Sequence, residues 1–171
     1  DRRRDVNFYS LHKNYEHFVK PLIDRNITMD LIVGNHDIYF KNTNELNSPD
    51  YLLDFDNINV YSDPIVKNYD GLDICLVPWI NTENYDDVEE FLGICSADII
   101  MCHGEITGAL VNPGNFQGGG TSPALFKRFE QVYSGHYHHK SILGNIKFLG
   151  SQMEFTWNDF GDEKHFHILD T

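Results

Sequence analysis

Three groups of polar residues in this sequence have side chains that suit metal binding. They are Gly34-Asn35-His36-Asp37, His103, and Gly135-His136-Tyr137-His138. Imidazole nitrogens and amide oxygens are good ligands for divalent transition metals. Alternate side chains of an extended segment point the same way, so we expect His136 and His138 to face one side together. The glycines before Asn35 and His136 are expected to allow tight turns that aim these side chains into a cleft.

Each group also has a simpler explanation when it is taken alone. A lone histidine such as His103 is more often a hydrogen-bonded core residue than a metal ligand. Asn and Asp favour turns, so Asn35-His36-Asp37 could form one. His136 and His138 could be the polar face of a strand. The occurrence of all three groups in one chain favours a shared metal-binding surface.

The elements that would position these groups follow an α/β pattern. Apolar residues at three- and four-residue steps predict an amphipathic helix from Asn7 to Ile23. Met29–Val33 is a short apolar strand that ends at Gly34, and Ile99–Cys102 is a second one that ends directly on His103. Ligands of α/β proteins often bind at the carboxyl ends of such strands.

The remaining sequence predicts further short elements around one long loop. The expected helices cover Tyr51–Phe55, Asp86–Ile94 and Ala124–Phe129, and the expected strands cover Ile58–Tyr61, Ile65–Lys67, Leu72–Val77, Val132–Tyr133, Ile146–Leu149 and His165–Leu169. Asp70-Gly71 supplies a hairpin turn. The segment from Gly104 to Ser122 is rich in glycine and predicts a mobile loop over a site. Its Gly118–Gly120 run either gates the access of substrate or is a plain flexible connection.

Composition and charge describe one globular domain. The chain has 171 residues, of which 41% are hydrophobic and 23% charged, and no stretch approaches the roughly 18 apolar residues of a membrane span. We therefore expect a soluble domain with no membrane partner. Cys75, Cys95 and Cys102 lie in apolar surroundings, which predicts buried thiols in a reducing compartment. The net charge of −13 argues against a polyanionic partner unless metal ions or another subunit supply positive charge.

In their order, the three polar groups resemble motifs of the calcineurin-like metallophosphoesterase superfamily. Its motifs run Asp-x-His, Gly-Asp, Gly-Asn-His-(Asp/Glu), His and Gly-His-x-His, and the last three are present here. We interpret Asp1-Arg2-Arg3 as a remnant of the second motif. The resemblance implies an α/β fold, namely a β-sandwich of two mixed sheets flanked by helices, with the N-terminal strand–helix portion missing. Residues 1–171 would then be one nuclease domain, truncated at the N-terminus and lacking a C-terminal capping region.

The resemblance implies four metal ligands. Asn35, His103 and His136 would bind one divalent ion, and His138 would bind a second one; Mn²⁺ is the expected metal. All four side chains are electrically neutral, whereas the missing motifs contain the carboxylates that offset the charge of the ions. We therefore expect the chain as it stands to bind Mn²⁺ weakly and to show no appreciable hydrolysis.

The resemblance also implies catalytic roles for His36 and Asp37. His36 would stabilise or protonate the leaving oxygen instead of binding metal, and Asp37 would fix the orientation of His36 and favour its protonated form. The two metal ions, roughly 3.5–4 Å apart, would activate a bridging water for in-line attack on a phosphoester. No covalent intermediate with the protein is needed.

Within the superfamily the chain most resembles SbcD-type DNA repair nuclease subunits and their tailed-phage recombination endonuclease counterparts. The similarity includes Val77-Pro78-Trp79 and Phe148-Leu149-Gly150-Ser151. It implies Mn²⁺-dependent exonuclease and endonuclease cleavage of DNA in a recombination and double-strand-break repair complex. The implied protein partners are a coiled-coil ABC-type ATPase subunit and a second copy of the chain, with Asn7–Ile23 in the dimer surface. The implied location is the cytoplasm of a bacterial cell or of a phage-infected host.

Two other functions remain open on the sequence alone. A phosphoesterase of small phosphoesters or phosphoproteins would use the same ligands and would fit the acidic charge better. A non-catalytic scaffold of the same fold is the third hypothesis, although the intact histidines argue against it. Outside the motifs, we expect Trp79 and Trp157 to pack in the core, with contact to substrate as the alternative. We expect His139, His165 and His167 to be surface or strand residues, with a third metal site as the alternative.

Overall fold

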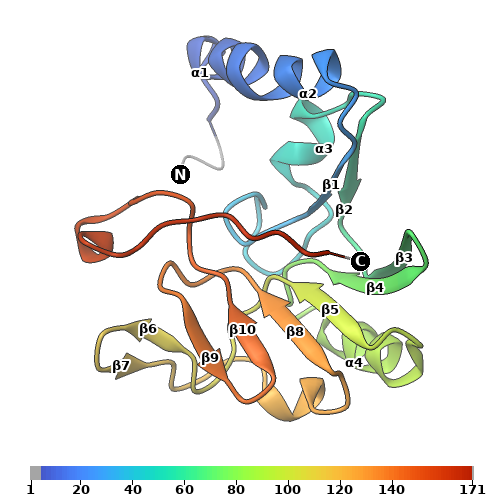
Figure 1. The fold of residues 1–171 in the computed structure, drawn as a ribbon, viewed down its shortest axis with the longest axis vertical. Helices are drawn as coiled ribbons and strands as arrows, with labels where there is room; N and C mark the ends of the chain where they lie inside the picture. Colours follow the sequence, from blue (N-terminus) through green and yellow to red (C-terminus); the bar gives the residue numbers. More distant parts are fainter. Residues whose placement is uncertain (1–4, 171) are drawn as a thin grey trace.

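A six-stranded mixed sheet forms the centre of the computed structural model, which describes residues 5–170 (Figure 1). Its strand order is β3-β4-β5-β8-β10-β9. The strands are β3 (Ile65–Tyr69), β4 (Leu72–Val77), β5 (Ile99–Cys102), β8 (Gln131–Ser134), β9 (Ser141–Leu143) and β10 (Ile146–Phe148). The central strands β4, β5, β8 and β10 run parallel, and β3 and β9 pair antiparallel at the two edges. The carboxyl ends of β4, β5 and β8 therefore lie along one edge of the sheet.

Two smaller sheets accompany the central one. β1 (Met29–Ile32) pairs in parallel with β2 (Ile58–Tyr61), and β6 (Leu110–Asn112) forms a hairpin with β7 (Asn115–Phe116). Figure 1 shows the β1–β2 pair above the central sheet, next to the first helices. The backbone N–H of Trp79, just after β4, donates to the carbonyl of Val33 at 2.7 Å. This hydrogen bond brings the carboxyl end of β1 to the carboxyl end of β4.

A continuous helical segment precedes β1, as predicted for Asn7–Ile23. It consists of α1 (Phe8–Asn14), the π-helical η1 (Tyr15–Val19) and α2 (Lys20–Asp24). The Asn7 side chain caps the segment by accepting the N–H of Ser10 at 2.8 Å. Within these helices only Val19 is buried, and Phe8 is 88% exposed. The apolar face of the segment is therefore only partly covered by the rest of residues 5–170, with the Tyr15 and Phe55 ring centroids 5.9 Å apart.

The core lies between the central sheet and the short helices that flank it. These are α4 (Tyr85–Ile94) and the 3-10 turn η2 (Pro123–Phe126). α3 (Ser48–Leu52) and the 3-10 turn η3 (Trp157–Asp159) contribute no residue to this core. Val88 and Leu92 of α4 are buried in one cluster with Ile100 of β5. Of the three cysteines, Cys75 and Cys102 are buried as predicted and Cys95 is partly buried, and all three are free thiols. Burial raises the pKa of the Cys102 thiol to about 12.

Several boundaries differ from the sequence prediction for identifiable reasons. The predicted strand His165–Leu169 is wrong, because residues 162–170 pair with no strand and Phe166 is 77% exposed. An alternation of apolar and polar residues forms a strand only where a neighbouring backbone supplies the hydrogen bonds of the ladder. Gly104–Ser122 is not a plain loop, because it contains the β6–β7 hairpin. The predicted Tyr51–Phe55 helix begins earlier, at Ser48, where Asn47 accepts the N–H of Asp50.

At the level of fold class the prediction is confirmed, because the chain is a mixed α/β protein. Residues 5–170 form one large mixed sheet and the parallel β1–β2 pair, so the expected metallophosphoesterase sandwich of two mixed sheets stays a prediction. The predicted remnant motif Asp1-Arg2-Arg3 lies outside the described residues. None of the helices within residues 5–170 combines the length and the apolar character needed to cross a membrane.

A charged network at Asp30 joins the small β1–β2 pair to the edge of the central sheet. The Asp30 carboxylate accepts hydrogen bonds from Lys67 Nζ at 2.8 Å, Tyr69 OH at 2.7 Å, Asn59 Nδ2 at 2.8 Å and Tyr61 OH at 3.0 Å. Burial alone would raise the pKa of Asp30, but these hydrogen bonds outweigh burial and lower it. The ionised form of Asp30 therefore stabilises the folded state.

We predict that Asp30→Asn lowers the free energy of unfolding at pH 7 by about 2 kcal/mol, the typical contribution of hydrogen bonds to a charged group. A carboxyl group whose pKa is lowered by folding contributes stability at neutral pH and loses it as the pH falls below the ordinary range of aspartate. The deficit of the variant should therefore shrink at pH 3. Urea unfolding at both pH values measures it, with the exposed Asp63→Asn as the matched control. An equal deficit at pH 3 and pH 7 would contradict this explanation.

Candidate functional site

Asn35, His103 and His136 meet where the strands of both sheets end. Asn35 lies in the loop after β1, His103 follows β5 directly, and His136 follows β8 after one glycine. Asn35 Oδ1 is 2.9 Å from His103 Nε2 and 3.3 Å from His136 Nδ1. The two imidazole rings are arranged edge to face with their centroids 5.4 Å apart. The structure thus brings together three residues that were predicted from separate motifs.

These separations suit a shared metal ion. Two ligand atoms that each lie about 2.1 Å from a cation, at about 90–110° from one another, are about 3.0–3.4 Å apart. The distances from Asn35 Oδ1 to the two imidazole nitrogens, 2.9 and 3.3 Å, are close to this range. An amide oxygen with two imidazole nitrogens is also a chemically reasonable donor set for a divalent transition metal. The residues present therefore fit the metal that the motifs imply.

Burial keeps His103 and His136 uncharged at neutral pH. Burial, with a smaller contribution from nearby histidines, lowers the pKa of His103 to about 3 and the pKa of His136 to about 4. His36 contributes to both shifts and His138 contributes to that of His136. All four histidines therefore share one electrostatic environment. A neutral imidazole has a nitrogen lone pair with which it can bind a cation.

Gly34 and Gly135 make room for the His103 ring. A Cβ at Gly34 would lie 3.1 Å from His103 Cε1, and a Cβ at Gly135 would lie 3.0 Å from His103 Nδ1. Neither glycine has a positive φ, whereas His136 has a φ of 79°. The predicted turn is present at Gly34, where the N–H of Asp37 donates to the Gly34 carbonyl at 3.1 Å. At the second position the prediction is corrected, because His136 itself adopts the left-handed conformation and Gly135 permits close packing.

The segment from Gly135 to His138 bends, so the predicted extended His-Tyr-His alternation is wrong. The left-handed backbone at His136 interrupts the strand. Tyr137 is buried and packs against Phe148 of β10, with ring centroids 5.3 Å apart. His136 turns to Asn35, and His138 turns to a different partner. The two histidines nevertheless stay close enough to interact electrostatically.

The partner of His138 is Asp159, which the sequence analysis missed. His138 Nδ1 lies 3.0 and 3.1 Å from the two Asp159 oxygens. Asp159 is 1% exposed and also accepts the backbone N–H groups of Phe155 and Thr156. Although burial alone would raise the pKa of Asp159, these hydrogen bonds lower it well below its ordinary value. A buried carboxylate on Nδ1 leaves Nε2 of His138 as the nitrogen for a cation, a common arrangement around metal-binding histidines.

His36 and Asp37, the predicted catalytic pair, lie in the loop that follows β1. His36 is exposed, and its charge influences both His103 and His136. Asp37 Oδ2 accepts the backbone N–H of Gly34 at 2.7 Å, which closes the turn that presents Asn35. His36 is therefore accessible beside the candidate ligands, and the orientation of His36 by Asp37 stays a prediction.

Neither tryptophan packs in the core, contrary to the prediction. Trp79 is partly exposed, and its ring lies 5.2 Å from the His136 ring and 5.9 Å from the His103 ring, measured between centroids. Trp157 is 92% exposed in η3. Sequence reasoning could not distinguish a buried indole from one that lies beside a site, because both follow an apolar run.

His139 is buried, which corrects its assignment to the surface. It is 5% exposed and forms an ion pair between Nδ1 and Asp162 Oδ2 at 2.5 Å. His139, Asp159 and Asp162 place ligand atoms within 4.8 Å of one another. Lys164 Nζ lies 3.2 Å from Asp162 Oδ2, however, and an ammonium ion there already provides the positive charge. Lys164 would therefore compete with a metal ion for this cluster, and the third metal site stays a prediction.

The two other histidines lie in the segment that follows η3. His167 is exposed, and its Nε2 lies 3.0 Å from the carbonyl oxygen of Leu149. His165 is partly buried, with its ring centroid 4.8 Å from that of His167. No strand forms at these residues, so they belong to an irregular segment.

We predict that Gly135→Ala weakens Mn²⁺ binding at least about tenfold, because the added methyl group displaces His103 from Asn35. Gly93→Ala is the matched control, since a Cβ at Gly93 meets nothing within 4 Å. Manganese titration, followed by calorimetry or by paramagnetic broadening of histidine NMR signals, measures the effect. Equal Mn²⁺ affinity in the two variants would contradict the role of Gly135.

We predict that Asp159→Asn weakens the binding of Mn²⁺ about 10- to 100-fold, as expected when the carboxylate behind a metal-binding histidine is lost. Asp162→Asn removes a neighbouring carboxylate that does not contact His138, and it should affect Mn²⁺ affinity less. Thermal unfolding of both variants separates loss of fold from loss of binding. If Asp159→Asn binds Mn²⁺ as well as the unchanged chain, Asp159 does not position His138.

The chain is similar to a phage protein over nearly its whole length. It is 33% identical over 171 residues to "Exonuclease subunit 1" of Enterobacteria phage T4. The aligned region covers 98% of this chain and 50% of the phage protein, so the chain spans about half the length of that relative. No protein-family model matches the chain. The residues that meet at the ends of β1, β5 and β8 thus belong to a chain that is similar to half of an exonuclease subunit.

Proposed function

We propose that this protein is a metal-dependent phosphodiesterase that cleaves DNA, as the exonuclease and endonuclease subunit of a recombination and repair complex. The observation that carries the proposal is the approach of Asn35 Oδ1 to nitrogens of His103 and His136. The name of the phage relative, an exonuclease subunit, supports a nuclease over other phosphoesterases. The word "subunit" in that name supports a function within a complex.

The chain offers three candidate ligands for one metal ion and one candidate ligand for a second. Asn35, His103 and His136 would hold one cation through Oδ1, Nε2 and Nδ1. His138 would hold a second cation through Nε2, while Asp159 fixes its ring from the other side. Bound divalent cations, Mn²⁺ above all, would activate water and neutralise phosphate oxygens during attack on the phosphodiester.

His36 would act on the leaving group. It is exposed beside two candidate ligands, in reach of a phosphate that lies over them. Its imidazolium form can donate a proton to the oxygen that leaves phosphorus. Asp37 would favour that form, while its hydrogen bond to Gly34 N–H holds the loop in place. His103 and His136 cannot share this task, because burial lowers their pKa values and keeps them unprotonated at neutral pH.

The acidic charge of the chain constrains how DNA would be held. With a net charge of −13, the protein repels a polyanion except where cations are bound. DNA binding would therefore depend on the metal ions and on partner subunits. We propose a coiled-coil ABC-type ATPase and a second copy of the chain as these partners, with the exposed apolar face of α1, η1 and α2 in the contact between copies.

Two alternatives make different predictions. A phosphoesterase of small phosphoesters or phosphoproteins would need no DNA-binding partner, and the acidic surface would suit it. A non-catalytic scaffold would keep the fold and hydrolyse nothing. The similarity to a phage exonuclease subunit favours DNA over both.

We predict that the natural protein in which these 171 residues occur degrades linear duplex DNA when Mn²⁺ is present, and that EDTA abolishes the reaction. His36→Ala should lower kcat about 100-fold or more, the usual contribution of a general acid, while Mn²⁺ affinity changes little. The 171-residue chain alone, whose four candidate ligands are neutral, should bind Mn²⁺ weakly and degrade no detectable DNA. Gel assays of end-labelled duplex and Mn²⁺ titrations give these quantities.

Exposed His17 provides the matched control, because His17→Ala removes an imidazole far along the chain in η1. Hydrolysis of bis(4-nitrophenyl) phosphate without degradation of DNA would favour the small-substrate alternative. Hydrolysis of neither substrate, with metal bound, would favour the scaffold. Full activity of His36→Ala would remove the proposed role of His36.

A further inference from the structure

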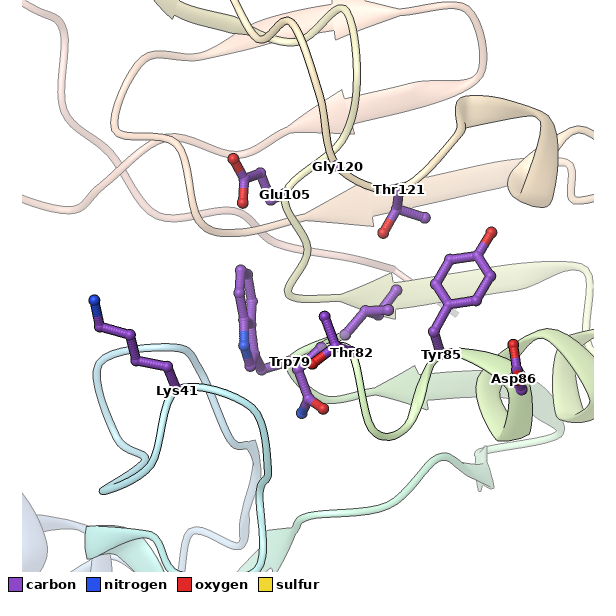
Figure 2. A pocket seen from close by; sticks show the side chains of 10 residues that line it. Lys41, Trp79, Thr82, Tyr85, Asp86, Glu105, Gly120 and Thr121 are labelled. Carbon is purple, nitrogen blue, oxygen red and sulfur yellow. The ribbon is translucent and has the colours of Figure 1, made fainter.

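A pocket of about 510 Å³ opens next to the candidate metal site. Its lining includes Trp79, Thr82 and Tyr85 from the segment that follows β4, and Glu105 and Thr121 from the two ends of the long loop. Figure 2 shows these two groups of side chains facing the pocket from opposite sides. The volume lies within the usual range of pockets for small organic ligands, about 300–1,000 Å³.

The Trp79 ring connects the pocket to the metal site. It lines the pocket, and its centroid is 5.2 Å from that of His136 and 5.9 Å from that of His103. A ligand that contacts Trp79 in the pocket therefore lies within one side-chain length of the candidate ligands. The two places are close enough for one nucleotide to occupy both.

Buried amide groups hold the backbone of Trp79 in place. Asn44 Nδ2 and Asn84 Nδ2 both donate to the Trp79 carbonyl at 2.9 Å, and Asn81 Nδ2 donates to Asn44 Oδ1 at 3.1 Å. The Trp79 N–H is held by Val33, as described above. Asn44 and Asn81 are only 6% and 9% exposed. A partly exposed aromatic ring on a backbone that is fixed from both sides is a rigid surface for stacking.

The opposite rim of the pocket is fixed as well. Thr121 N–H donates to the Glu105 carbonyl at 2.7 Å, which closes the base of the long loop. Gly120, with a φ of 100°, packs so closely that a Cβ there would lie 2.4 Å from the Glu105 carbonyl oxygen. Gln117 donates to the Glu105 side chain and holds it at the rim. The pocket therefore has defined walls on both sides.

The charged side chains of the lining favour the base of a nucleotide over its phosphate. Asp86 and Glu105 contribute two carboxylates, and Lys41 contributes one ammonium group. Two carboxylates disfavour a phosphate in the pocket, whereas they can accept hydrogen bonds from the exocyclic amino groups of bases. An aromatic ring stacks on any base, because every base has a π face. The lining thus fits a nucleobase and directs the phosphate outward, toward the histidines.

We infer that this pocket binds the base of the nucleotide whose phosphate lies at the candidate metal site, with Trp79 as the stacking surface. The inference rests on the proposed cleavage of DNA and specifies the substrate, namely DNA whose terminal base is unpaired at the reacting end. A base-paired end could not place its base in a pocket of this kind, because a stacked base is enclosed by its neighbours. Fraying of the last base pair would precede each cut.

The test uses the fluorescence of Trp79. The chain has two tryptophans, and Trp157→Phe leaves Trp79 as the single emitter; Trp157 is 92% exposed, so its replacement should not disturb the fold. This variant is titrated with deoxyadenosine 5′-monophosphate and with deoxyribose 5-phosphate, each with and without Mn²⁺. We expect saturable quenching by the nucleotide, tighter with Mn²⁺, and no quenching by the sugar phosphate.

A matched pair of variants at Thr82 identifies the pocket. Thr82 is exposed and lines the pocket, so Thr82→Phe should fill the space and weaken binding of the nucleotide at least tenfold. Thr82→Ser should keep the affinity for the nucleotide within about twofold of its value without a change at Thr82. Circular dichroism and thermal unfolding establish that both variants are folded. Unchanged quenching in Thr82→Phe, equal quenching by both ligands, or no quenching by the nucleotide would each overturn the inference.

The nucleotide titration and the DNA degradation assay give separate results. Quenching by the nucleotide without any degradation of DNA would keep the base pocket and remove DNA cleavage. Degradation of DNA without quenching would remove the pocket and keep the cleavage. The two failures are therefore distinguishable.

Discussion

The contact of Asn35 with His103 and His136 is the interaction on which the candidate site depends. It joins the loop after β1 to the carboxyl ends of β5 and β8, which belong to a different sheet. The hydrogen bond from Trp79 N–H to the Val33 carbonyl holds the same two sheets together nearby. The distances between the ligand atoms are thus set by how the small sheet sits on the large one, and a shift of either sheet would separate them.

The neutral histidines of the candidate site belong to an acidic chain. Burial at the end of the central sheet removes the charge of His103 and His136, so the site adds no positive charge of its own. A cation bound there would be the main local attraction for a phosphate on a chain of net charge −13. By thermodynamic linkage, a phosphate ligand that binds through the cation also tightens the binding of that cation. Bound metal would therefore increase the affinity for substrate, and bound substrate would increase the affinity for metal.

Sequence reasoning predicted elements with a clear apolar run and predicted poorly those that depend on distant partners. The bounds of β2, β4 and β5 are as predicted, because each is an apolar run between polar or turn residues. β9 escaped prediction because Ser141–Leu143 is too short to have a period. The predicted strand at His165–Leu169 failed because no backbone pairs with it among residues 5–170.

The same limit applies to the site. Asn35, His103 and His136 could be predicted because each has a motif, whereas Asp159 contacts His138 from 21 residues away. A signal did exist, because Thr156 and Asp159 have the spacing of a capping box, and the structure contains that box. This spacing predicts a helical turn, but it does not indicate that the Asp159 carboxylate contacts His138. The asparagines around Trp79 are separated by up to 40 positions and form no local pattern.

The left-handed backbone of His136 means that stability and the proposed metal binding favour different residues at this position. With a φ of 79°, this position would suit glycine, and a residue with a Cβ costs about 1 kcal/mol more there. The chain nevertheless has an imidazole at this position, next to Asn35 and Trp79. Selection for stability alone would replace His136, so variants chosen only for thermal tolerance would tend to lose this candidate ligand first.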